Sequence, residues 1–90
     1  MTTPIHRPGA HQFEATLDGH AGRLDYSVRG DVLTILHTEV DPALEGRGVA
    51  GALVRAALDH ARASGLKVRP SCPYAASYME RHPESMSLRA

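Results

Sequence analysis

The chain has 90 residues, enough for one small domain with a compact core. Ten lysines and arginines balance ten aspartates and glutamates, so neither nucleic acid nor an anionic membrane is an expected partner. A single cysteine, Cys72, excludes an internal disulfide and favours a reducing compartment. With no leader pattern and no apolar run long enough for a membrane span, we expect a soluble, cytoplasmic protein.

Two stretches in the first third of the chain alternate apolar and polar residues, as half-buried strands do. The apolar positions are Phe13, Ala15 and Leu17 in the first stretch and Leu24, Tyr26 and Val28 in the second. Asp18-Gly19 lies between them and predicts a turn. After the second stretch, Gly30-Asp31 fits a two-residue hairpin with glycine in its first central position.

Residues 32–40 form a third run that is apolar on both faces in its first half, which predicts a central strand. Strict alternation would place His37 and Glu39 on the same face as Leu33 and Ile35. Three consecutive strands with short turns predict an antiparallel meander.

Residues 49–64 carry a broad apolar stripe at three- and four-residue spacing, which predicts an amphipathic helix, and Gly65 is a good stop. The short run 66–69 reads as a fourth strand, parallel to the third because a strand–helix–strand unit is right-handed. Pro73 fits the first position of a second helix over residues 74–81.

These elements predict an α/β fold with a three-stranded antiparallel meander, a crossover helix, a parallel fourth strand and a short second helix. We expect one domain over residues 11–83, with flexible tails at 1–10 and 84–90.

The third strand and the long helix are joined by a glycine-rich stretch, residues 45–51. Gly46 and Gly48 let the backbone turn tightly and let a ligand approach closely. No Ser, Thr, Asp or Asn follows within the turn to cap the helix, so its first amides lack a partner. Together with the helix dipole and Arg47, they favour an anion, most plausibly phosphate. A hydrated glycine turn is the plain alternative.

The glycines literally spell G-x-G-x-x-G, the dinucleotide fingerprint, at Gly46, Gly48 and Gly51. That fingerprint needs a doubly wound sheet and an acidic residue about 20 positions on. This chain has room for one strand–helix–strand unit, and the corresponding strand reads Lys67-Val68-Arg69-Pro70. A Walker loop is excluded because no Gly-Lys-Ser/Thr follows.

The stretch Glu45–Ala50 instead resembles the Q/R-x-x-G-x-G/A diphosphate loop of the GNAT (GCN5-related) acyltransferases, which bind acetyl-coenzyme A. Residues 11–83 as a whole are similar to very short GNAT-like proteins. The shared motifs are His37-Thr38-Glu39-Val40, Gly46-Arg47-Gly48, Cys72-Pro73-Tyr74, Tyr78 and Arg81-His82-Pro83. Glu45 stands where the wider family usually has Gln or Arg. The first strand and two helices that build the acceptor side of a GNAT site are missing.

The resemblance implies a minimal GNAT-like fold in which the third and fourth strands splay apart, leaving a gap that pantetheine fills like an added strand. It also implies acetyl-coenzyme A as the cofactor and a small-molecule or peptide amine as the acceptor. The implied cofactor contacts are Thr38, Glu39, Val40, Gly46, Arg47, Gly48, Val49, Ala50 and Gly51.

Four side chains are candidates for the chemistry. His37 and Glu39 are candidate bases for deprotonating an amine, although a sheet histidine and a solvated glutamate explain them equally well. Tyr78 matches the tyrosine that protonates the coenzyme A thiolate in many GNATs, and Tyr74 is the better candidate for a core residue. Cys72 lies at a helix N-terminus, where the dipole favours the thiolate, and could relay an acyl group; a small buried thiol is the alternative. The histidines show no paired metal-ligand spacing, so we assign no metal.

The expected function is acetyl transfer to an amine by direct attack on the thioester. The alternative is a module that binds or senses coenzyme A with little or no turnover. An exposed sheet edge would permit a weak homodimer as well as a monomer.

Overall fold

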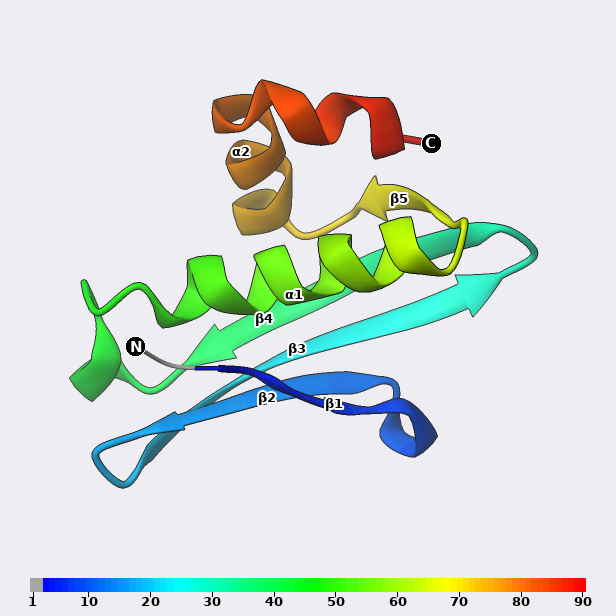
Figure 1. The fold of residues 1–90 in the computed structure, drawn as a ribbon. Helices are drawn as coiled ribbons and strands as arrows, with labels where there is room; N and C mark the ends of the chain where they lie inside the picture. Colours follow the sequence, from blue (N-terminus) through cyan, green and yellow to red (C-terminus); the bar gives the residue numbers. More distant parts are fainter. Residues whose placement is uncertain (1–2) are drawn as a thin grey trace.

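The computed structural model describes residues 3–90, which form a mixed five-stranded sheet with two α-helices (Figure 1). The strands are β1 (Ile5–Arg7), β2 (Gln12–Leu17), β3 (His20–Arg29), β4 (Val32–Val40) and β5 (Lys67–Pro70). The helices are α1 (Val49–Ala63) and α2 (Pro73–Arg81), with short 3₁₀ segments η1 (Pro8–Ala10), η2 (Pro42–Leu44) and η3 (Pro83–Leu88). The strands lie in the order β1-β2-β3-β4-β5, antiparallel except for the parallel pair β4–β5. The predicted α/β class and topology are confirmed.

Residues 3–10 and 84–90 differ from the expectation of flexible tails, while residues 1–2 of the first expected tail lie outside the described residues. Residues 5–7 form β1 and pair with β2, so the meander has four strands. At the other end, η3 buries Ser85 and Leu88, and the amide of Ala90 donates to the carbonyl of Val68 at 2.8 Å. The terminal segments thus extend the sheet at one edge and cover the core at the other.

His6 anchors β1 through an aromatic cluster. Its ring stacks on Phe13, with centroids 4.3 Å apart and planes 6° apart. Its Nε2 lies 2.6 Å from the hydroxyl of Tyr26, and its ring centroid is 4.4 Å from that of His60 on α1. Burial, together with the nearby charge of His60, holds the pKa of His6 below its ordinary value.

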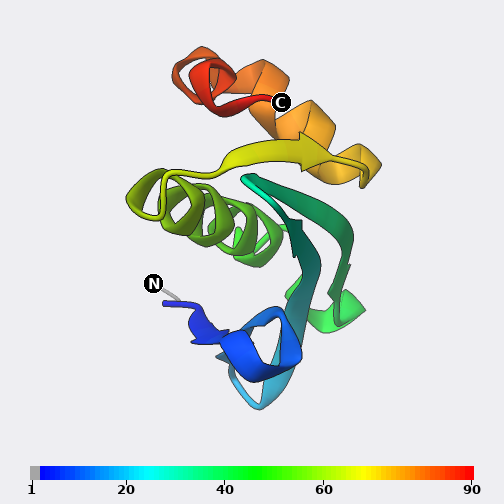
Figure 2. The same ribbon diagram turned by 90° about the vertical axis from the view of Figure 1, so that its right-hand side faces the viewer.

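Helix α1 covers one face of the sheet, and the opposite face of β2 to β4 carries no helix within the described chain (Figure 2). The predicted stripe is confirmed, because it is the buried side of α1. The stripe consists of Val49, Leu53, Val54, Ala57, Leu58 and Ala61. These side chains pack with Leu24, Leu33 and Ile35, all fully buried, in one core cluster. Helix α2 and η3 lie beyond the β5 edge (Figure 2).

Strand β4 contains a β-bulge at Leu36. Asp25 of β3 lies opposite His37, but the next residue, Tyr26, lies opposite Ile35, so Leu36 is an extra residue without a partner. A bulge of this kind interrupts the alternation of side chains along a strand.

The bulge reverses the faces that simple alternation predicts for the end of β4. Thr38 lies opposite Leu24, which is fully buried, and therefore points to the α1 side. His37 and Glu39 point to the bare side instead. The expectation that these two side chains share the face of the buried residues earlier in the strand is therefore wrong, although they do share a face with each other.

Strand β5 pairs with β4 only from Val32 to Ile35. The amides of Ser71 and Cys72 both donate to the carbonyl of Ile35, at 3.1 Å each, and the chain then turns into α2. Strand β4 continues to Val40, well past the end of β5 (Figure 1). The predicted divergence of these two strands is therefore present, with its apex at Ile35.

Candidate functional site

The glycine turn after β4 leads into an uncapped helix. Gly46 and Gly48 have φ of 78° and 80°, the left-handed region that favours glycine. Gly48 is the N-cap of α1, and no side chain within residues 3–90 caps it. The first hydrogen bond that closes the helix runs from the amide of Ala52 to the carbonyl of Gly48, at 3.0 Å. The amides of residues 49–51 come before that bond and have no acceptor inside α1, so they are available to an anion.

Arg47 is placed less favourably for a ligand than its neighbours. Its amide donates to the carbonyl of Leu44 at 3.0 Å. Its guanidinium Nη2 lies 3.2 Å from Oδ2 of Asp18, in the turn between β2 and β3. The main-chain groups available to an anion are therefore those of residues 48–51, which we call the cradle. Arg47 instead stabilises the turn through its ion pair with Asp18.

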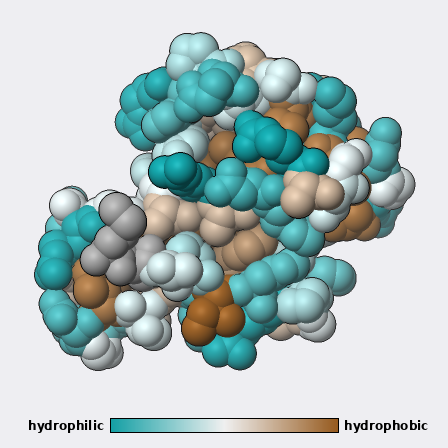
Figure 3. Space-filling model, viewed as in Figure 1, coloured by the Kyte–Doolittle hydropathy of each residue, from teal (hydrophilic) through white to brown (hydrophobic). Residues whose placement is uncertain are grey.

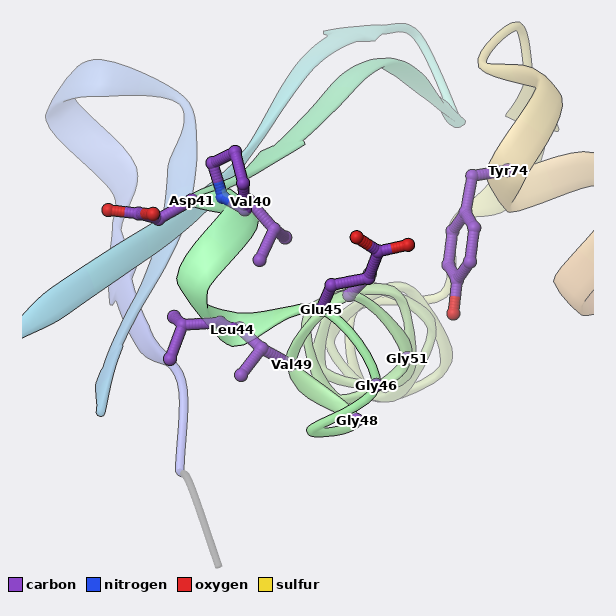
Figure 4. A pocket seen from close by; sticks show the side chains of 11 residues that line it. Val40, Asp41, Leu44, Glu45, Gly46, Gly48, Val49, Gly51 and Tyr74 are labelled. Carbon is purple, nitrogen blue, oxygen red and sulfur yellow. The ribbon is translucent and has the colours of Figure 1, made fainter. Parts of the chain in front are cut away.

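A groove of about 540 Å³ opens between the glycine turn, the end of β4 and the start of α2. In Figure 4 the carboxylate of Glu45 lies above α1, which is seen end-on, and the ring of Tyr74 lies beside the helix. Among the predicted cofactor contacts, the groove is lined by Val40, Gly46, Gly48, Val49, Ala50 and Gly51; Asp41, Pro42, Leu44, Glu45 and Tyr74 complete it. None of this second group was among the cofactor contacts predicted from the sequence.

Neither tyrosine of α2 has the surroundings expected for it from the sequence. Tyr74, expected in the core, is 36% exposed and lines the groove. A Cβ added to Gly51 would lie 3.4 Å from the Tyr74 hydroxyl. Tyr78 is half-buried and stacks on His82, with ring centroids 3.9 Å apart, beside a neighbouring hollow. The reason is geometric: α2 leaves the sheet after β5, so its first turn lines the groove and its second does not. The sequence did carry a signal for this: Tyr74 directly follows Pro73, the first residue of α2, and therefore lies in the first turn of the helix.

Burial raises the pKa of Tyr78 above its ordinary value, and the charge of Arg55 opposes this only partly. Tyr78 is therefore protonated at neutral pH.

Cys72 joins the start of α2 to the free part of β4. Its thiol is 3.6 Å from the hydroxyl of Thr38, and the residue is only 6% exposed. Burial alone would raise the pKa of the Cys72 thiol, but hydrogen bonding to the backbone of Ala75 and to Thr38 outweighs it and lowers that pKa overall. The thiol therefore loses its proton more readily than an ordinary cysteine thiol, and it lies on the α1 side of β4.

His37 and Glu39 lie across the sheet from that thiol. His37 Nε2 is 3.4 Å from Glu39 Oε2, and the same carboxylate oxygen is 3.4 Å from Nη2 of Arg23. Both side chains are more than half exposed. The predicted catalytic residues are thus divided by β4, with the candidate bases on the bare face and the thiol and tyrosines on the helical side.

Two further findings bear on the kind of site. Within residues 3–90, no three His, Cys, Asp or Glu side chains come together in a cluster that could hold a metal ion. None of the helices described for those residues is long and apolar enough to cross a membrane.

Comparison with known proteins gives the family. Residues 12–88 match the family described as GCN5-related N-acetyl-transferase, and the chain belongs to it. Protein NATD1 of Mus musculus is 37% identical over 75 residues, which cover 80% of this chain and 68% of NATD1. Human NATD1 is also 37% identical over 75 residues, covering 80% of this chain and 66% of that protein.

Solved structures agree with this assignment. The solution structure of a GCN5-like protein of Staphylococcus aureus superimposes with a TM-score of 0.77 at 26% identity, covering 97% of this chain and 86% of that one. The crystal structure of a Trypanosoma brucei acetyltransferase gives a TM-score of 0.56 at 21% identity, covering 93% and 66%, and shows the shared fold alone.

Proposed function

We propose that the protein binds acetyl-coenzyme A in the groove between the glycine turn, β4 and α2, and transfers the acetyl group to an amine. The observation that carries this proposal is the uncapped start of α1 after two glycines with left-handed backbone, at the far end of the β4 edge that β5 leaves free. Membership of the GCN5-related family supports the same reading.

The cradle at residues 48–51 would hold the diphosphate, because main-chain amides and the positive end of the helix dipole both favour negative charge. The edge of β4 from Leu36 to Val40, which β5 leaves free, would hold the pantetheine amides. When bound, acetyl-coenzyme A supplies the activated acetyl group as a thioester. The residues nearest the apex of the gap are Ile35, Leu36 and Cys72.

The acceptor would reach this gap from the bare face of the sheet, where His37 and Glu39 lie. Either side chain would take the proton that a primary amine must lose before it attacks. The hydroxyl of Tyr74 would lie beside Gly51 and contact the diphosphate, so Tyr78, expected from the sequence to protonate the leaving thiolate, stays the candidate acid. The proposed acceptor is a small-molecule or peptide amine, the class expected from the sequence.

A second candidate function is a coenzyme A carrier or sensor with little turnover. The observation that favours it is the exposure of His37 and Glu39, because within the described residues no helix encloses an acceptor over them. A thiol relay through Cys72 is a variant of the enzyme hypothesis. The thiolate would attack the acetyl carbonyl, coenzyme A would leave as the thiol, and the amine would then take the acetyl group from sulfur.

The test is calorimetry with acetyl-coenzyme A on matched glycine variants. Gly48→Glu puts a carboxylate into the cradle and should weaken binding by more than tenfold, since a like charge replaces a favourable contact. Gly30→Glu is the control: Gly30 also has a positive φ, of 58°, and open space around it, but lies in the hairpin between β3 and β4. It should lose stability but bind normally.

Absence of binding to the wild-type protein would refute the proposal, as would equal affinities for wild-type and Gly48→Glu proteins. Consumption of acetyl-coenzyme A with a panel of primary amines then separates the enzyme from the carrier. Binding without any acetylated amine would favour the carrier.

A further inference from the structure

A second hollow, of about 940 Å³, runs along the outer side of α1. It is lined by Gly51 and Ala52 of α1 and also by Leu17 and Tyr78. Figure 3 shows a pale band of small or apolar side chains over α1, with the more polar surface of α2 and η3 above it. The hollow shares Gly48 and Gly51 with the groove at the glycine turn, so the two spaces meet at the start of α1.

Arg55 supplies positive charge within this hollow. It follows Gly51 by four residues, so the two share a helix face about 6 Å apart along the axis. Arg47 also lines the hollow, but its guanidinium is paired with Asp18.

Arg55 itself is only weakly paired. Its Nε is 4.0 Å from Oδ2 of Asp59, whereas Nη1 of Arg62 is 3.3 Å from Oδ1 of the same carboxylate. Asp59 is thus bound mainly by Arg62. The side chain of Arg55 is 77% exposed, so most of its donors are open to solvent; Asp59 lines the same hollow.

We propose that Arg55 binds the 3′-phosphate of coenzyme A and makes the protein select coenzyme A over forms that lack this phosphate. This rests on the proposed function, because the diphosphate must first be held at the start of α1. The 3′-phosphate is one ribose away from that diphosphate, and the hollow leads from the cradle directly past Arg55. A guanidinium can grip a phosphate through two parallel hydrogen bonds, which a hydroxyl at the same position does not offer.

The experiment compares coenzyme A with 3′-dephospho-coenzyme A by calorimetry on three proteins. The wild-type protein should prefer coenzyme A by about tenfold, the worth of one charge-assisted hydrogen-bonded contact. Arg55→Ala should bind coenzyme A only as well as the dephospho form, while its affinity for the dephospho form stays at the wild-type value. Arg62→Ala is the matched control, on the same helix and with the same partner Asp59, and should keep the preference.

Arg55→Lys retains the charge but not the bidentate geometry, and should keep part of the preference. Raising the salt concentration should narrow the preference in the wild-type protein and leave Arg55→Ala unaffected.

Different failures identify different errors. Equal affinities of the wild-type protein for the two forms, or an equal loss for both in Arg55→Ala, would overturn the role of Arg55 and leave the diphosphate site intact. Binding of neither form to the wild-type protein would overturn the Arg55 inference together with the proposed function.

Discussion

Replacing Gly51 or Gly48 by alanine should shift the stability of the protein in opposite directions. A Cβ at Gly51 would lie 3.4 Å from the hydroxyl of Tyr74 and 3.6 Å from Cε2 of Tyr78, which are ordinary contact distances. Gly51 lies inside α1 and lacks the left-handed backbone of Gly48. Alanine is the better helix former by up to about 1 kcal/mol. We therefore expect Gly51→Ala to stabilise the protein by about 0.5 kcal/mol and raise Tm by a few degrees.

Gly48→Ala has open space for the new methyl group, but φ is 80°. An alanine forced into that region costs about 1 kcal/mol, which lowers Tm by roughly 4–8 °C in a domain of this size. Gly30→Ala, with φ of 58° in a distant hairpin, should show a similar cost and serves as the control for backbone strain alone.

Coenzyme binding should follow a different pattern from stability. The methyl group of Gly51→Ala occupies space between α1 and Tyr74, and should weaken acetyl-coenzyme A binding by about tenfold, the loss of one charge-assisted contact. Gly30→Ala should bind normally. The measurements are thermal unfolding by circular dichroism without ligand, and calorimetry with acetyl-coenzyme A. A lower Tm for Gly51→Ala would contradict the placement of Gly51 inside a regular helix. A stabilised Gly51→Ala protein with unchanged affinity for acetyl-coenzyme A would refute the placement of the diphosphate in this groove.

Three further predictions concern individual side chains. Cys72→Ala should keep its acetyl-transfer rate if attack is direct, and a stable acetyl group found on Cys72 by mass spectrometry would show the relay instead. Tyr74→Phe should raise the KM for acetyl-coenzyme A more than Tyr78→Phe does, because the Tyr74 hydroxyl lies beside Gly51, whereas Tyr78→Phe should lower kcat; steady-state kinetics showing the reverse would give the acid role to Tyr74. His6 has a lowered pKa in the folded protein, so its neutral form stabilises the fold above the ordinary value of 6.5, and this contribution is lost as the pH falls through the folded pKa. His6→Phe should therefore flatten the fall of Tm with acidification; an unchanged pH profile would mean that another group causes it.

Periodicity predicted the strands and the long helix because burial on one face leaves a regular trace in the sequence. Phe13 and Ala15 alternate with polar residues and are buried, and the apolar stripe of α1 is its buried side. The turn at Gly46 and Gly48 could also be predicted, because glycine is the residue that most readily adopts the left-handed backbone found at both positions. These local signals were sufficient for the fold class and for the position of the glycine turn.

What could not be predicted depends on contacts between distant parts of the chain. Strand β1 has three residues, too few for a period, and exists because it pairs with β2 and His6 packs on Phe13. Leu88 in η3 is buried only because the chain end folds back to Val68. The surroundings of Tyr74 likewise depend on the path of α2 rather than on helix periodicity.

The extra residue at Leu36 determines what each half of β4 presents to each side of the sheet. If the bulge were straightened with Leu36 in place, every later side chain of β4 would change sides. His37 and Glu39 would then turn toward the core, where a charged pair is costly, and Thr38 would turn away from Cys72. Deleting Leu36 would instead leave these side chains on their present sides, because His37 would then follow Ile35 directly in an unbroken pleat. The bulge thus lets one strand present the proposed cofactor side under the helices and the proposed acceptor side to open solvent.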